Sequence, residues 1–163
     1  MRKILISLLL IIITVTAYSQ AVTPPRLIEM LDWPIKRVDT TLKKADYLLM
    51  KKDVDSTSSL YEYGWFDKEK DGKGVARSFI LMDAQVRNMK SRLLTYRTYE
   101  KEEYQQMAAW LLANNYKSTA KYDFKEAQHT LYSNGVLTIR VKVITTQLKT
   151  GKKFIAYEWE VGK

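Results

Sequence analysis

The chain has 163 residues, 46% hydrophobic and 28% charged, a balance that excludes an intrinsically disordered protein and fits a small globular one. It has no cysteine and a single histidine, which excludes a disulfide framework, a Cys–His nucleophile and a histidine-rich zinc site. With 27 basic and 18 acidic residues the chain is basic, which favours anionic partners.

The N-terminal segment 1–19 is predicted to be a secretory signal peptide. A positively charged start is followed by the apolar run Ile4–Val15, and small side chains in Ala17-Tyr18-Ser19 precede a cleavage position before Gln20. This run is shorter than the roughly 20 apolar residues that cross a bilayer. We therefore expect a cleaved, secreted or periplasmic protein with no membrane span in the mature chain.

Removal of Arg2 and Lys3 with the signal peptide leaves 25 basic residues against 18 acidic ones. This excess favours another exported protein with an acidic surface, or an anionic component of the cell envelope, as partner. Export disfavours a nucleic-acid partner. Because charges of both signs are mixed along the chain, a role of the excess in solubility alone is the favoured interpretation.

Residues 20–99 are predicted to form a first α+β unit with an N-terminal extension. The apolar side chains of the extension, Leu27, Ile28, Leu31 and Trp33, are expected to pack as a lid on the body. From Ile35 the apolar residues recur at helical spacing, and the helix is expected to end near Lys51-Lys52. Three antiparallel strands are expected next, at Leu60–Phe66, Val75–Asp83 and Ser91–Tyr99.

Within the second of these strands the continuous apolar run Phe79–Met82 predicts burial on both faces of the sheet. The polar loop before it, Asp67–Gly74, has the turn residues of a hairpin tip. Its alternating acids at Asp67, Glu69 and Asp71 imitate the start of a calcium loop, but Ser78 stands where the loop needs a glutamate. We therefore predict no metal site and no cofactor, with calcium binding by this loop left open.

Residues 100–163 are predicted to form a second α+β unit. Its helix carries an apolar stripe from Tyr104 to Leu112, and Asn134-Gly135 marks a hairpin between later strands. The expected strands are 118–124, 127–133, 136–147 and 154–161. Arg140 and Lys142 are expected to pair across the sheet with Glu158 and Glu160.

An internal repeat is suggested by matching Tyr47-Leu48-Leu49 with Trp110-Leu111-Leu112 in the second unit. The predicted fold class is therefore α+β, with tandem helix-plus-antiparallel-sheet units (αβββ-like) whose helices pack on one face of the sheets. This arrangement resembles secreted proteins with tandem helix-then-strand units, including β-lactamase inhibitor proteins and PepSY-like domains of the cell envelope. The resemblance is one of architecture and assigns no residue a role.

The sheet face opposite the helices is the predicted place for a ligand, because Tyr and Arg are frequent in binding hot spots. The candidate ligand- or partner-binding residues are Tyr61, Tyr63, Arg77, Tyr96, Arg97 and Arg140. No catalytic residue is predicted, so we expect a protein that is not an enzyme and acts as a binding module. The alternatives are an inhibitor or chaperone-like partner of another exported protein, and a small hydrolase using His129.

Overall fold

The computed structural model describes residues 22–67, 74–147, 151 and 153–163. The predicted signal peptide and most of the loop Asp67–Gly74, whose calcium binding was left open, lie outside the described residues. The helices are α2 (Pro24–Glu29), the 3-10 turn η1 (Met30–Asp32), α3 (Ile35–Lys44) and α4 (Lys101–Ala113). The strands are β1 (Leu48–Val54), β2 (Ser58–Phe66), β3 (Val75–Val86), β4 (Met89–Thr98), β5 (Lys117–Phe124), β6 (Ala127–Ser133), β7 (Thr138–Gln147) and β8 (Lys153–Gly162).

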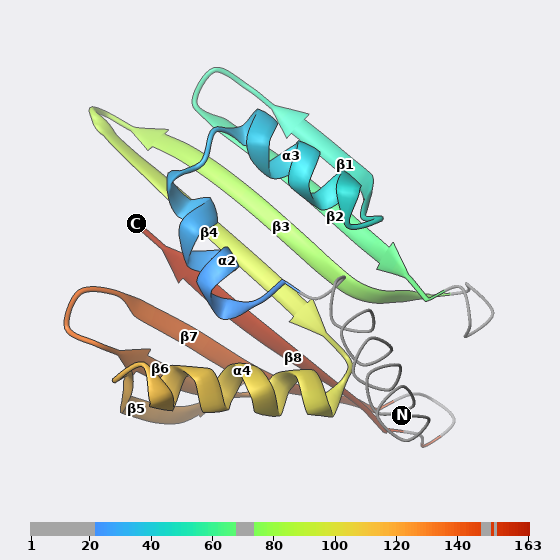
Figure 1. Cartoon of the computed structure of the whole chain (residues 1–163), viewed down its shortest axis with the longest axis vertical. Helices are drawn as coiled ribbons and strands as arrows, with labels where there is room; N and C mark the ends of the chain where they lie inside the picture. Colours follow the sequence, from blue (N-terminus) through green and yellow to red (C-terminus); the bar gives the residue numbers. More distant parts are fainter. Residues whose placement is uncertain (1–21, 68–73, 148–150, 152) are drawn as a thin grey trace, which may run out of the picture.

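The predicted fold class is wrong. Instead of tandem helix-plus-sheet units, the described residues form mostly one eight-stranded antiparallel sheet in the order β1-β2-β3-β4-β8-β7-β6-β5 (Figure 1). Strands account for 55% of these residues and helices for 24%, counting the 3-10 turn together with the three short α-helices. Because β4 pairs directly with β8, the strands of both predicted units belong to one sheet.

One cause of the error lies at the end of α3, which stops at Lys44 rather than near Lys51-Lys52. Asp46 has a φ of 62°, a left-handed conformation that ends a helix, and the Tyr47 amide donates to the Leu42 carbonyl in the closing turn. Residues 48–54, assigned by their spacing to the helix and the following connection, become the edge strand β1, which is exposed along its whole length. Because these residues are all exposed, none of them belongs to a buried stripe, and the agreement of their spacing with a helix was misleading.

The two halves of the sheet, β1–β4 and β5–β8, share local geometry where a helix leads into the first strand of each half. Asn115 repeats the left-handed conformation of Asp46, with a φ of 62° at both residues. Tyr116 repeats the bond of Tyr47, donating its amide to the Leu111 carbonyl. The first strand of each half then has a bulge, between Leu49 and Lys51 and between Ser118 and Ala120.

These matches correct the repeat alignment suggested by the sequence. That alignment pairs Tyr47, which follows helix α3, with Trp110, which lies inside helix α4, whereas the structure matches Tyr47 with Tyr116. At the junction of the halves, Tyr96 faces Trp159 and Leu94 faces Val161 on either side of the pair Thr95–Glu160. The two halves are thus related by an approximate two-fold axis through that central pair.

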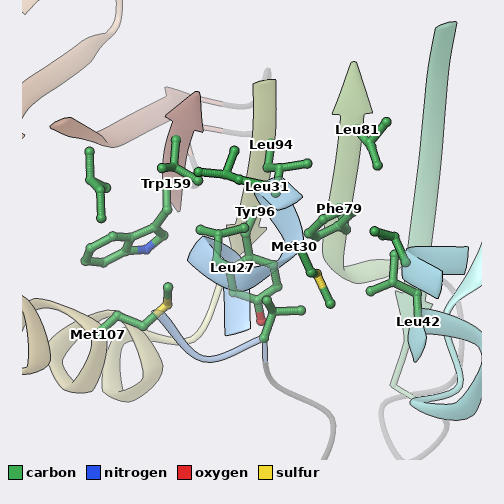
Figure 2. Close-up of a cluster of buried hydrophobic side chains, with 14 of the residues drawn as sticks. Leu27, Met30, Leu31, Leu42, Phe79, Leu81, Leu94, Tyr96, Met107 and Trp159 are labelled. Atoms are coloured by element: carbon green, nitrogen blue, oxygen red, sulfur yellow. The ribbon is translucent and has the colours of Figure 1, made fainter. Parts of the chain in front are cut away.

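The core lies between the helices and one face of the sheet, here called the helix face. In Figure 1 helices α2, α3 and α4 all lie over this face. Figure 2 shows Leu27 of α2, Leu42 of α3 and Met107 of α4 pointing toward strand side chains of the helix face. The strand residues that share this buried cluster are Tyr63, Phe79, Leu81, Leu94, Tyr96, Ile139, Val141, Trp159 and Val161.

The predicted N-terminal lid is confirmed. Leu27, Leu31 and Trp33 are buried and Ile28 is packed against the core. Arg92 of β4 holds the lid in place, since it donates to the Leu31 carbonyl at 3.3 Å and to the Trp33 carbonyl while pairing with Asp83. An arginine suits this position because its planar fork can serve a carboxylate and carbonyl oxygens at the same time.

Candidate functional site

The second face of the sheet, here called the distal face, points away from α2, α3 and α4. Strand residues alternate between the two faces, so the register assigns every side chain to one of them. One row of distal residues runs Leu48, Gly64, Ser78, Arg97, Glu158, Lys142, His129, Tyr122 across all eight strands. The neighbouring row runs Lys51, Glu62, Ile80, Thr95, Glu160, Arg140, Leu131, Ala120.

The centre of the distal face is a continuous network of five charged side chains, here called the central ion network. Arg97 Nε donates to Glu158 Oε2 at 3.0 Å, and Lys142 Nζ donates to Glu158 Oε1 at 2.7 Å. Lys142 also donates to Glu160, which accepts a bond of 3.1 Å from Arg140 Nη1. The cross-strand pairing of Arg140 and Lys142 with both glutamates, expected from the sequence, is therefore confirmed.

The charges of the central ion network reinforce one another despite their burial. Burial of the Glu158 carboxylate opposes its ionisation, but the bonds from Lys142 and Arg97 outweigh burial and hold its pKa below the ordinary range. In the same way burial disfavours the charged forms of Lys142 and Arg97, and the bonds to glutamate raise the pKa of each. Glu158, Lys142 and Arg97 are therefore all charged at neutral pH.

Large apolar side chains flank the network on the distal face. On the β3–β4 side Met82 and Leu93 face each other directly and remain 41% and 37% exposed. The predicted burial of Phe79–Met82 on both faces is therefore wrong: Phe79 and Leu81 are buried under the helices, whereas Met82 is exposed because it belongs to the distal face. Further exposed apolar residues on this face are Leu48, Met50, Met89, Tyr122, Phe124 and Phe154.

His129 lies on the distal face of β6, opposite Lys142. Its ring stacks on Tyr122, with 5.0 Å between centroids, and meets the edge of Phe124. The ring is buried, and its Nδ1 atom makes no hydrogen bond within the described residues. His129 is therefore part of an aromatic cluster with Tyr122 and Phe124. The alternative of a hydrolase that uses His129 stays a hypothesis.

The structure does not bring the six sequence-predicted site residues to one surface. Arg97 and Arg140 lie on the distal face. Tyr61, Tyr63, Arg77 and Tyr96 lie on the helix face, where Tyr63 and Tyr96 are fully buried. The sequence did not identify the exposed distal residues Met82 and Leu93, although their alternation with buried Leu81 and Leu94 is a detectable signal.

Arg77 and Tyr96 belong to a second polar cluster, which is buried between α4 and the helix face. Glu103 of α4 accepts bonds from Arg77 Nε at 2.9 Å, from Thr98 Oγ1 at 3.0 Å and from the Tyr96 hydroxyl. Burial raises the pKa of Tyr96 far above its ordinary value, so the phenol stays a donor. The cluster satisfies its own groups and ties α4 to the sheet, which is a structural role.

A groove of about 680 Å³ lies at one end of the sheet, between the Trp33-Pro34 segment and the β1–β2 turn. Its charged groups other than Lys90 have partners among the described residues. Asp55 accepts bonds from the amides and hydroxyls of Thr57 and Ser58, which lower its pKa to about 2. Arg92 is committed to Asp83 and the lid, so this groove offers less for a ligand than the distal face does.

Among the described residues no group of three or more His, Asp or Glu side chains is placed to hold a metal ion. Within the same part of the chain, no helix has the length and apolar character needed to span a membrane. In comparisons with known proteins, no family model, no curated protein and no solved structure matches the chain.

Proposed function

We propose that this protein is an exported, non-catalytic binding module that contacts another protein through the distal face of its sheet. The observation that carries the proposal is the set of large apolar side chains exposed there, with Met82 and Leu93 facing each other beside the central ion network. Exposed apolar groups combined with arginine and aromatic side chains are typical of protein interfaces. Burial of either half-exposed side chain would stabilise a complex by roughly 1 kcal/mol.

The edges of the sheet argue that a partner binds the face and does not add a strand. The edge strands β1 and β5 carry Lys51, Lys52, Lys117 and Lys121, and each has a bulge. Lysines and bulges on edge strands oppose pairing with another chain. This supports a contact made by side chains of the distal face.

Site-specific crosslinking tests the proposal. A photoreactive amino acid placed at Leu93, on the distal face, is expected to capture a partner of discrete mass from an extract of exported proteins. The matched control carries the same group at Leu112, which is 63% exposed on α4, away from the distal face. Unlabelled protein should compete, whereas the double variant Met82→Lys, Leu93→Lys should not. Equal capture from both positions, or no capture from Leu93, would refute the proposal.

A further inference from the structure

The central ion network is asymmetric in what it presents to the surroundings. Its two carboxylates are covered, with 5% of the Glu158 side chain and 13% of the Glu160 side chain exposed. The guanidinium-bearing side chains above them are 38% exposed at Arg97 and 46% exposed at Arg140. The network also holds three cations against two anions, so it presents positive charge at its surface.

Both arginines have donors beyond those that their glutamates use. A guanidinium carries five N–H donors. Arg97 directs Nε and Nη2 to Glu158 and also has a side-chain hydrogen bond with Tyr99, whereas Arg140 directs Nη1 to Glu160, so donors remain on both. The glutamates orient both side chains before any ligand arrives, which lowers the entropic cost of binding. Such oriented guanidinium groups are suited to receiving carboxylates.

The surroundings of the arginines define what kind of acid fits. The two residues lie on β4 and β7, with β8 between them, and their partners on β8 are two residues apart, so their backbones lie about 12 Å apart. Around them the face is mixed: Ile80 and Leu93 lie on one side and Leu131 on the other, with the polar Ser78 and Thr95 beside Arg97. The strand register places two other carboxylates on the distal face, Glu62 on β2 and Asp53 on β1, and both lie toward the β1 edge of the sheet.

We propose that the distal face recognises an acidic segment of the partner protein, in which Asp or Glu side chains flanked by apolar residues bind to Arg97 and Arg140. The inference rests on the proposed function and adds the chemistry of the partner. Two separate guanidinium groups with apolar side chains nearby favour isolated carboxylates over a polyanion, because a polyanion is held best by a continuous run of cations. The apolar neighbours of the acid would cover Leu93 and Met82.

The test uses a random dodecapeptide library displayed on phage, selected against the full chain purified from an exporting host. Enriched peptides are expected to carry Asp or Glu beside aliphatic or aromatic residues. One enriched peptide, made synthetically, should bind roughly tenfold or more weakly to the double variant Arg97→Gln, Arg140→Gln. The matched control Lys36→Gln, Lys44→Gln removes the same charge from exposed positions of α3 and should leave the affinity within about twofold.

A second double variant tests whether a loss of binding could come from misfolding. The double variant Arg97→Lys, Arg140→Lys keeps both positive charges opposite the glutamates but removes the planar fork of each guanidinium. It should therefore fold normally and bind the peptide several-fold more weakly than the unaltered protein does. Circular dichroism and thermal melting confirm the fold of each variant. Full affinity in the arginine-to-glutamine variant, or peptides without acidic enrichment, would overturn the inference.

The outcomes separate this inference from the function on which it rests. Loss of binding in Met82→Lys, Leu93→Lys but not in the arginine variants would keep the distal face as the binding surface and reject the acidic segment. Binding that none of these substitutions alters would reject both. Phosphatidylglycerol vesicles and dextran sulfate are measured in parallel, and arginine-dependent binding to them in the absence of acidic peptides would assign the face to a polyanion and overturn the inference.

Discussion

The two faces of the sheet are built from the same strands and differ in nearly every physical property. On the helix face Phe79, Tyr96 and Trp159 are fully buried, and its charged cluster around Glu103 is closed off by α4. On the distal face Met82 and Leu93, which belong to the same strands as Phe79 and Tyr96, stay exposed. The short helices therefore cover one face only, so stability is expected to depend on the helix face and binding on the distal face.

The largest expected effect comes from truncating a core side chain of the helix face. Phe79→Ala removes a ring that is fully buried, and the cavity left behind should lower the free energy of unfolding by about 3–5 kcal/mol. Met82→Ala, further along the same strand on the distal face, should cost less than about 1 kcal/mol because the side chain is half exposed. Urea denaturation of both variants measures the difference, and equal losses would contradict the division into two faces.

The second prediction compares the loss of stability when each of the two charged clusters is disrupted. Glu103→Ala leaves the Arg77 guanidinium and the Tyr96 hydroxyl without their buried acceptor, and should destabilise the protein by about 3 kcal/mol. Arg140→Gln on the distal face opens a pair that is 46% exposed at the arginine, so the cost should stay below about 1 kcal/mol. Chemical denaturation at low and high salt checks this prediction. A loss at Arg140 as large as that at Glu103 would show that the distal network supports the fold.

A smaller effect is expected from acid. The Glu158 pKa is lower in the folded protein than its ordinary value of 4.5, so the unfolded chain takes up the proton first as the pH falls. The stability that ionised Glu158 contributes is therefore complete above about pH 4.5 and is lost as the pH falls toward the folded pKa. Thermal melts from pH 7 to pH 3 should show a smaller acid-induced loss in Glu158→Gln than in the unaltered protein. An identical slope in both proteins would contradict the depressed pKa.

The smallest effect is expected at Gly64 on the distal face of β2. An added Cβ would lie 3.2 Å from Met50 Cγ and 3.4 Å from Val75 Cγ2. The Met50 chain is flexible and half exposed, so it can move, and alanine also restricts the unfolded chain. Gly64→Ala should therefore change the free energy of unfolding by no more than about 0.5 kcal/mol in thermal melts. A loss comparable to that of Phe79→Ala would mean that this part of the distal face is tightly packed.

Local patterns predicted several elements of the fold well. The period-2 alternation at Ile139, Val141 and Val143 predicted β7, and the acids of β8 were correctly paired with Arg140 and Lys142. Helix α4 was predicted from its apolar spacing, although Leu112 at the end of that stripe is exposed. These predictions succeeded because each depends on residues that are close in sequence or on strands joined by one short hairpin.

The candidate site was predicted only in part, for a different reason. Tyr63 and Tyr96 were grouped with Arg97 because of residue type, yet the register places the tyrosines under the helices and the arginine on the distal face. A shift of one residue along a strand exchanges the faces. The face of each strand therefore depends on where the strand begins, and β1 itself was assigned to a helix and a connection because the turn at Asp46 was not foreseen.

Spacing along the chain was enough to predict the apolar stripes of the helices, the alternation of the strands and the charge pairs of the β7–β8 hairpin. It could not predict that β4 and β8 join the strands into one sheet, or that the helices cover a single face of it. Both of these features depend on contacts between residues far apart in sequence. Those same contacts leave Arg97, Arg140, Met82 and Leu93 together on the distal face.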